Sequence, residues 1–304
     1  MNKVKWGNCS GYIIDSKDNH DVINCEVCKF KHIIPIPSKS QIDEMYSDDY
    51  YKLDKPNYIK EAKKDEEWWK LAYNNRYDSF ESILPSNRRK LLDIGSGPGF
   101  FLLQGKHRGW TVKGIEPSNS PYEYSKHSLN LDVENIFFDE TTYKKFEKFD
   151  VINMSLVLEH IPSPIEFLKL IYNRLSDGGL VSIEVPNDYN PFQKAALESL
   201  KIDPYWVAPP HHINYFNFDS LEELLKDVGF EIVLKESTFP IDIFLLMEEN
   251  YIGNDLLGKR CHKMRKNFEN NLYNVGQDEL KRKLYKEMAR LNIGREIIMI
   301  GQKN

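Results

Sequence analysis

The sequence lacks any apolar run of the roughly 20 residues that a membrane-spanning helix needs. Its first residues, MNKVKWGNCSGY, contain no apolar stretch that would serve as the core of a signal peptide. It has only four cysteines in 304 residues, too few for a disulfide scaffold. It has no surplus of basic charge, because its net charge is −5. We therefore expect a cytoplasmic protein without a membrane partner and without broad electrostatic binding to nucleic acid.

Short apolar segments that alternate with helical ones dominate the middle of the chain. The hydrophobic share of 41% is sufficient for a folded core. Residues 85–190 show the alternation that is typical of a parallel sheet covered on both faces. The sequence thus predicts a doubly wound α/β fold, with strands at 90–95, 111–116, 133–138, 150–155, 180–185, 231–237 and 296–301.

The sequence predicts four regions. Residues 1–38 form a turn-rich module, residues 39–84 form connecting helices, residues 85–239 form the α/β core, and residues 240–304 form a helical cap followed by the last strand. A helix is expected between Pro56 and Pro85. Its spacing places Arg76 on one face with three aromatic side chains, those of Trp69, Tyr73 and Phe80. Arg76 therefore either reaches out to water or meets a buried anion.

The strongest motif is a glycine-rich turn in KLLDIGSGPGF, residues 90–100. An apolar strand ends at Asp93, and the glycines that follow allow a ligand to approach the backbone before a helix begins. Glu116 ends the next strand, 21 residues after Gly95, where an acid is placed to accept the hydroxyls of a ribose. Asp93 would repel a pyrophosphate but suits a cationic group such as a sulfonium. These residues indicate a nucleoside-containing cofactor that carries positive charge.

Together with FDVINMSLVLEHIPSP at 149–164 and LSDGGLVSIEVPN at 175–187, this motif resembles the class I S-adenosylmethionine-dependent methyltransferases over residues 85–235. The resemblance implies a Rossmann-like sheet of seven strands, the last one antiparallel, and S-adenosylmethionine as cofactor. It also implies a set of cofactor-binding residues: Asp93, Gly95, Ser96, Gly97, Gly99, Glu116, Pro117, Asp139, Met154, Ser155 and Leu156. The methionine carboxylate of this cofactor is one candidate for the buried anion of Arg76. For Asp139 a solvated turn aspartate is the alternative.

The loop PPHHINYF supplies the candidates for a general base, because histidine takes up a proton near neutral pH. It resembles a loop of sugar C-methyltransferases in which His212 aligns with the presumed base, while His211 replaces that family's glutamate. O-methylation is therefore equally admissible. His160 of the LEH motif either shapes the site or caps the following helix. The alternative for the loop is a structural helix entry anchored by Phe216.

The end of the chain resembles bacterial methyltransferases of surface-polysaccharide biosynthesis, through LGKRCHKMRKNFE and NIGREIIMIGQKN. We therefore expect a small-molecule acceptor, a sugar or nucleotide-sugar. Its phosphates would bind to Arg260, His262 and Arg265, and the alternative is that these three residues form a solvated helix face. One alternative is a methyltransferase that acts on tRNA or on a protein side chain, and the negative net charge disfavours the RNA acceptor. The other alternative is a non-catalytic scaffold protein that binds the cofactor. The oligomeric state is not predicted.

A cysteine knuckle, NCEVCKFKH, indicates a structural zinc site in residues 1–38. Candidate ligands lie within 24 residues of one another: Cys9, His20, Cys25, Cys28 and His32. The segment resembles the zinc-ribbon module that precedes some sugar methyltransferases. The alternative is a metal-free knuckle with buried thiols. We expect this module to cover the acceptor cleft together with tyrosines of the connecting segment, Tyr46, Tyr50 and Tyr51.

Overall fold

The computed structural model describes residues 2–46 and 58–304, without the side chains of residues 43, 44, 46 and 58. Its contacts divide the chain into two compact units. We call one the ribbon unit, formed by Met1–Ile36, Glu184–Leu224 and Ile232–Met299, and the other the core unit, formed by Pro37–Ile183, Leu225–Glu231 and Ile300–Asn304. Each unit is built from segments that are distant in the sequence.

Parallel strands with buried side chains form the centre of the core unit. Strand β5 (Lys90–Ile94) pairs in parallel with β6 (Thr111–Ile115) on one edge and with β8 (Phe149–Ser155) on the other. Leu91 and Ile152 are fully buried on these strands. Such continuous apolar runs are expected where helices cover both faces of a sheet. The predicted strands at 90–95, 111–116 and 150–155 are therefore confirmed.

These strands belong to a mixed sheet of seven, whose order is β11-β12-β9-β8-β5-β6-β7. The remaining members are β7 (Val133–Glu134), β9 (Leu175–Pro186), β11 (Phe230–Ser237) and β12 (Glu296–Lys303). The predicted Rossmann-like fold with seven strands is confirmed. Strand β7 is shorter than the predicted 133–138, because Asn135 turns its side chain onto the carbonyls of Glu116 and Pro117 at 2.9 Å.

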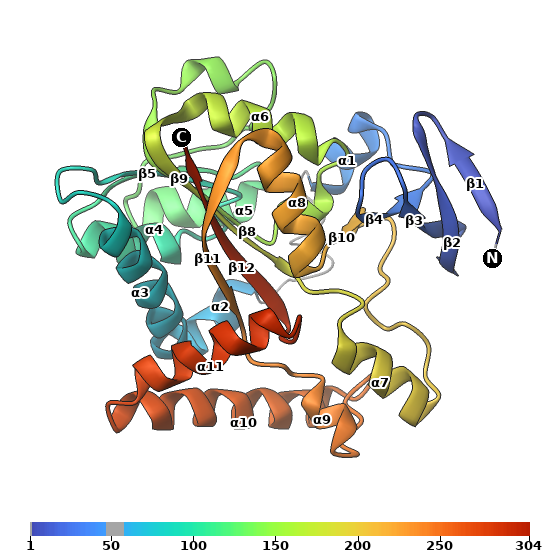
Figure 1. Ribbon diagram of the computed structural model, residues 1–304. Coiled ribbons are helices and arrows are strands. Elements are labelled where there is room, and N and C mark those ends of the chain that lie inside the picture. The colour runs from blue at the N-terminus through green and yellow to red at the C-terminus, as the bar shows by residue number, and fades with distance from the viewer. Residues whose placement is uncertain (1, 47–57) are drawn as a thin grey trace. The chain divides into compact units, whose positions relative to one another are not determined.

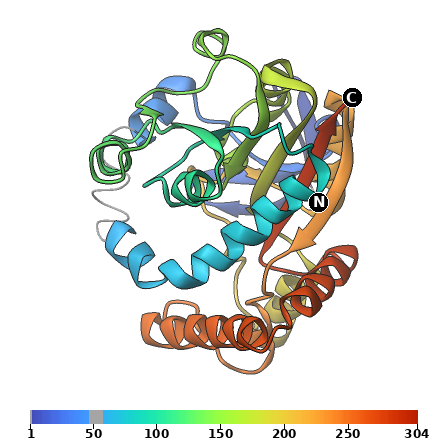
Figure 2. The same ribbon diagram turned by 90° about the vertical axis from the view of Figure 1, so that its left-hand side faces the viewer.

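Helices of the core unit follow or precede these strands: α1 (Lys39–Tyr46), α2 (Tyr58–Lys64), α3 (Glu66–Ile83), α4 (Phe100–His107), α5 (Asn119–Glu123) and α6 (Pro164–Arg174). Helix α3, drawn in light blue to cyan in Figure 2, ends before Pro85 as predicted. The expected single helix is, however, interrupted at Asp65, which separates α2 from α3, and Pro56 lies outside the described residues. Tyr77 and Phe80 are fully buried on α3, and the Tyr77 ring stacks on Phe101 of α4. This aromatic contact fixes α3 beside the helix that follows the glycine turn.

The ribbon unit contains an antiparallel sheet of five strands, ordered β1-β2-β3-β4-β10. Four come from the start of the chain and are drawn in blue in Figure 1: β1 (Lys3–Trp6), β2 (Cys9–Lys17), β3 (His20–Cys25) and β4 (Lys31–Ile34). The fifth is β10 (Asn214–Tyr215), in which Asn214 pairs with His32 of β4. The module of residues 1–38 thus shares its sheet with the loop that carries PPHHINYF.

The ribbon unit also contains α7 (Pro191–Leu200), α9 (Ile243–Leu246), α10 (Asp255–Asn274) and α11 (Asp278–Arg290), while α8 (Phe218–Val228) and β9, β11 and β12 run through both units along the chain. Helices α10 and α11 lie side by side in both views (Figures 1 and 2), and the Tyr285 hydroxyl donates to Glu269 at 2.6 Å between them. Within the described ranges, no helix combines the length and the apolar character needed to cross a bilayer.

Candidate functional site

The turn between β5 and α4 requires glycine at three alternate positions. Gly95, Gly97 and Gly99 have φ angles of +71°, +52° and +83°, a region that other residues rarely occupy. A Cβ on Gly95 would lie 2.6 Å from a methyl group of Val157, and one on Gly99 would lie 2.6 Å from a methyl group of Leu131. The loop therefore has a conformation that only this glycine pattern allows.

Glu116 holds this loop from the end of β6. Its carboxylate accepts the backbone N–H groups of Gly97 and Ser118, each at 2.8 Å, and its side chain is almost fully buried. Burial raises the pKa of Glu116 to about 7, against the opposing effect of these hydrogen bonds. Each carboxylate oxygen has a second lone pair, so Glu116 can accept further hydrogen bonds from a ligand.

Asp93 is a second buried acid beside the loop. It is 4% exposed, and the Asn153 side chain donates to its Oδ1 at 2.8 Å. Burial raises the pKa of Asp93 to about 7, and the charge of Glu116 adds to this, while Asn153 and Arg76 oppose it. Two acids and one guanidinium thus influence one another here, which favours a ligand that brings positive charge.

Arg76 is buried on α3 and does not extend into water. It is 8% exposed, and its Nη1 donates to the Ser182 hydroxyl at 2.9 Å. The structure therefore excludes the exposed environment for Arg76, while its contact with an anion stays a prediction. The Ser96 hydroxyl of the glycine turn is also buried and has no hydrogen-bond partner among the described residues. A buried hydroxyl without a partner fits a loop that contacts a polar ligand.

The other predicted cofactor residues occupy different environments in the core unit. The Asp139 carboxylate accepts hydrogen bonds from Thr141 and Thr142, in a local turn. Met154 is fully buried in β8, and Ser155 ends that strand half-buried. Leu156 follows with a φ of +56° and a side chain that is 47% exposed. A leucine in this strained conformation, with its apolar side chain exposed, is typical of a residue that lines a ligand site.

The predicted histidines lie in two parts of the fold. In the core unit, His160 ends the short helix Leu158–His160, and its Nε2 lies 3.7 Å from Oε1 of the buried Glu159. In the ribbon unit, His211 and His212 are half-buried in the loop before β10, and the His212 ring lies 6.4 Å from that of Tyr215. Of the predicted phosphate-binding residues on α10, Arg260 pairs with Glu249 at 3.3 Å.

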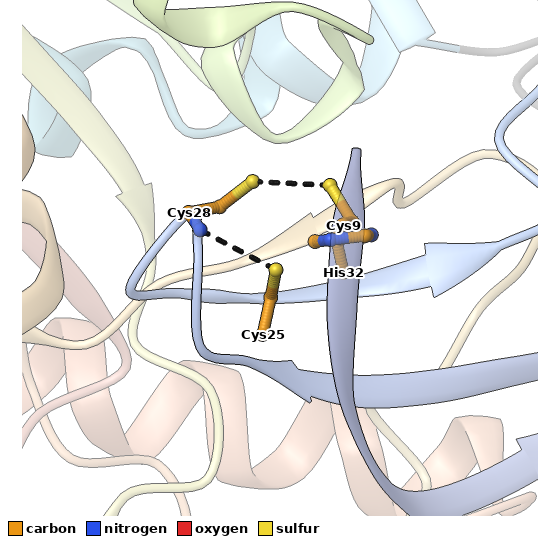
Figure 3. Close-up of side chains that lie close together, drawn as sticks. All are labelled: Cys9, Cys25, Cys28 and His32. Atoms are coloured by element: carbon orange, nitrogen blue, oxygen red, sulfur yellow. Dashed lines mark hydrogen bonds between the residues drawn. The ribbon is translucent and has the colours of Figure 1, made fainter. Parts of the chain in front are cut away.

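A cluster of metal-ligand side chains lies in the ribbon unit (Figure 3). Cys9, Cys25, Cys28 and His32 bring one ligand atom each to within 4.8 Å of one another. The Sγ atoms of Cys9 and Cys28 are 3.3 Å apart. Ligands about 2.3 Å from a tetrahedral zinc lie about 3.8 Å from one another, so small shifts would place these four around one ion.

The surroundings of this cluster fit metal ligation. The Nδ1 atom of His32 lies 3.0 Å from the Ile33 carbonyl, and its buried Nε2 has no hydrogen-bond partner among the described residues. This leaves Nε2 with a lone pair for a metal. Burial raises the pKa of the Cys25 thiol, but backbone N–H groups, including that of Cys28, outweigh this and lower it. Such N–H groups stabilise a thiolate.

His20 lies outside this cluster, so the choice between the two candidate histidines falls on His32. The Nδ1 atom of His20 lies 2.8 Å from the Asp18 carbonyl, in the turn between β2 and β3. That turn is at the far end of β3 from Cys25, which excludes His20 as a ligand of the same ion. Of the tyrosines expected near the module, Tyr50 and Tyr51 and the side chain of Tyr46 lie outside the described residues.

Two residues that position the acids were not predicted. Ser118 donates its backbone N–H to Glu116, and Asn153 donates its side chain to Asp93. Asn153 leaves a signal in the sequence, because it is an amide within the apolar strand DVINMS. A polar side chain in a strand buried on both faces needs a buried partner, and here that partner is Asp93.

The fold and the glycine turn with its two acids are those of a Rossmann-like α/β methyltransferase. Residues 63–235, more than half of the chain, match the model of a family described as methyltransferase domain. The chain belongs to this family. A solved structure of a SAM dependent methyltransferase from Archaeoglobus fulgidus is similar in fold, with a TM-score of 0.51 and 20% identity over 84% of this chain and 100% of that one.

Curated relatives are similar over a shorter stretch. A ubiquinone biosynthesis O-methyltransferase of Saccharophagus degradans is 33% identical over 97 residues, which are 30% of this chain and 41% of the relative. One of Pseudomonas entomophila is 32% identical over 104 residues, 33% of this chain and 45% of the relative. The chain thus matches less than half the length of these relatives, and the similarity leaves the acceptor undefined.

Proposed function

We propose that this protein transfers a methyl group from S-adenosylmethionine to a hydroxylated small molecule. Family membership supports the reaction. The observation that carries the proposal is the loop Gly95–Gly99, held by the buried Glu116 next to the buried Asp93. A glycine turn above two acids fits a ligand with a ribose and a positively charged amino-acid group.

In this proposal the residues of the core unit hold the cofactor. Glu116 accepts the ribose hydroxyls through its remaining lone pairs, while Asp93 faces the positive charge. Asp139 and the residues around Leu156 bind the adenine and line the transfer site. When bound, S-adenosylmethionine supplies a methyl group that is activated by its sulfonium. The chain then needs to align the acceptor with that methyl group and to exclude water.

We further propose that the acceptor is a sugar or nucleotide-sugar and that His212 accepts its proton. The resemblance of the His212 loop to that of sugar methyltransferases supports this assignment. The half-buried position of His212 next to Tyr215 is compatible with a base that is shielded from bulk water. A phenolic hydroxyl is the second candidate acceptor, because the curated relatives are ubiquinone biosynthesis O-methyltransferases.

Calorimetric titration with S-adenosylhomocysteine tests the cofactor site. We expect Glu116→Ala to weaken binding by about 1–3 kcal/mol, the value of hydrogen bonds to a charged group. Glu166→Ala is the matched control, because Glu166 is an exposed acid of α6 that pairs only with Lys169 among the partners described. Wild-type protein that binds no adenosyl compound at millimolar concentration would refute the proposal. Binding without methylation of any sugar, phenol, RNA or protein acceptor would favour a scaffold role.

We also propose that Cys9, Cys25, Cys28 and His32 bind one structural zinc ion. Three thiols and an imidazole form a closed ligand set without a position for water, which is typical of structural zinc. One small apolar cluster of the ribbon sheet contains the buried residues Ile23, Cys25 and Ile34, with Cys9 and Cys28 packed against it, so a metal held there would contribute folding energy.

Metal analysis of the purified protein tests this site. We expect about one zinc per chain in the wild type, and loss of most of it in Cys25→Ser. Cys261→Ala serves as the matched control, because Cys261 is buried in α10 and is not part of the cluster. Protein purified without chelators that contains no zinc would refute the proposal.

A further inference from the structure

A buried charged residue that the proposed mechanism does not use lies just beyond the end of β9. Asp188 of the ribbon unit is only 2% exposed. Its backbone N–H donates to the Phe216 carbonyl at 3.0 Å, and the N–H of the preceding Asn187 donates to the Arg295 carbonyl at 2.9 Å. Three chain segments therefore fix the position of Asp188, and one of them is continuous with the loop of His212.

Donors surround the Asp188 side chain without completing hydrogen bonds to it. The Arg295 Nη1 atom lies 3.7 Å from Asp188 Oδ1, which is an ion-pair distance beyond hydrogen-bond range. The amide of Gln193, in the first turn of α7, is close enough to lower the pKa of Asp188. Among the described residues, neither carboxylate oxygen of Asp188 has a hydrogen-bond partner, and the buried Arg295 Nη1 and Gln193 Nε2 have none either.

These four atoms are two acceptors and two donors, all buried. Native proteins satisfy nearly all such atoms, so the group that belongs here both donates and accepts. An anion would be repelled by Asp188 and a cation by Arg295, whereas a hydroxyl group donates one hydrogen bond and accepts others. Two adjacent hydroxyl groups would donate to the two carboxylate oxygens and accept from the guanidinium and the amide.

We propose that Asp188, Gln193 and Arg295 bind a vicinal pair of hydroxyl groups on the methyl acceptor. This inference rests on the proposed function and narrows its substrate class to diols. A sugar and a catechol both carry this chemistry. Aromatic rings lie in the same part of the unit, since Tyr189 packs edge-on against Trp206 at 5.2 Å and Tyr215 at 6.0 Å, and such rings suit the apolar face of either ligand.

The charge on Asp188 gives this site a pH dependence. Burial raises the pKa of Asp188 to about 7, opposed by Arg295 and Gln193 and reinforced by the more distant charges of Asp242 and Glu296. Asp188 also interacts with Tyr215, whose pKa is raised mainly by burial, so that this phenol stays neutral. Since the ionised carboxylate is the better acceptor, diol binding should strengthen by about tenfold between pH 6 and pH 8.

Binding measurements with saturating S-adenosylhomocysteine test the proposal. The probes are UDP-glucose, with UDP as its control, and catechol, with phenol as its control. We expect at least one diol to bind better than its control, and both Asp188→Asn and Arg295→Lys to weaken its binding at least tenfold. Asp203→Asn changes an exposed aspartate that precedes the same loop, and it should have no effect. The rise with pH should disappear in Asp188→Asn.

Two results would overturn the inference. In the first, neither diol binds better than its control. In the second, both variants bind the diol as the wild type does, and Asp188 and Arg295 would then form only a structural ion pair. If Asp188→Asn does not fold, Arg295→Lys decides, because it keeps the charge and removes only the planar donors. Wild-type protein that fails to bind S-adenosylhomocysteine would instead count against the proposed function. The two failures are therefore distinguishable.

Discussion

Replacement of Asp93 by asparagine should make the cofactor-free protein more stable at alkaline pH while it weakens the cofactor site. The carboxylate of Asp93 is buried, and its pKa is raised from 3.8 to about 7. The unfolded chain therefore ionises this acid more readily than the folded chain, so stability falls as the pH rises from about 4 through 7. Asparagine has the same shape and keeps the acceptor oxygen for Asn153, but it never ionises.

The difference between a pKa of 3.8 and one of about 7 corresponds to about 4 kcal/mol at pH 8 and about 2 kcal/mol at pH 5. We therefore expect the stability gain of Asp93→Asn over the wild type to be about 2–3 kcal/mol larger at pH 8 than at pH 5. Urea unfolding at both pH values measures this gain. Identical gains at the two pH values, or a variant less stable at pH 8, would refute the reasoning.

Three further predictions concern the loop, the base and the metal. Gly99→Ala should weaken S-adenosylhomocysteine binding in calorimetry. Gly109→Ala is the control, because Gly109 has a similar φ of +82° but open space for a Cβ. This control should lower the stability in urea unfolding by about 1–2 kcal/mol and leave binding unchanged. His212→Ala should lower the turnover of a methylated acceptor roughly a hundredfold, and a near-wild-type rate would exclude it as the base. His32→Ala should weaken zinc binding in competition with a chelator by more than the roughly 10- to 100-fold that loss of an outer-shell partner costs, and an unchanged affinity would exclude His32 as a ligand.

The sequence was sufficient for those parts of the fold that depend on local patterns. Continuous apolar segments predicted the parallel strands, because helices cover both faces of that sheet. The glycine spacing predicted the turn after β5, because the positive φ angles there exclude other residues. Local spacing also gave the cysteine knuckle of the metal cluster.

Contacts between segments that are distant in the chain could not be predicted from the sequence. Spacing alone could not choose between His20 and His32, since the choice depends on how β3 and β4 pair. The environment of Arg76 depends on Ser182, more than a hundred positions away in the chain. The sequence contains a signal that points to Asp188 as a candidate site residue. It lies in a polar stretch directly after an apolar strand, as do the acids at the ends of β5 and β6. Its burial, however, follows from contacts with Phe216 and Arg295.

The pairing of β10 with β4 has a consequence for any attempt to dissect this protein. His32 faces Asn214 across that ladder, and the Ile33 N–H donates to the Ile213 carbonyl at 2.9 Å. Cutting away the first segment of the chain would expose an unpaired strand edge beside the histidine loop. The segment is therefore unsuited to transplantation as an independent tag. Exchanges between homologous proteins should move both pieces together, although some 180 positions separate them.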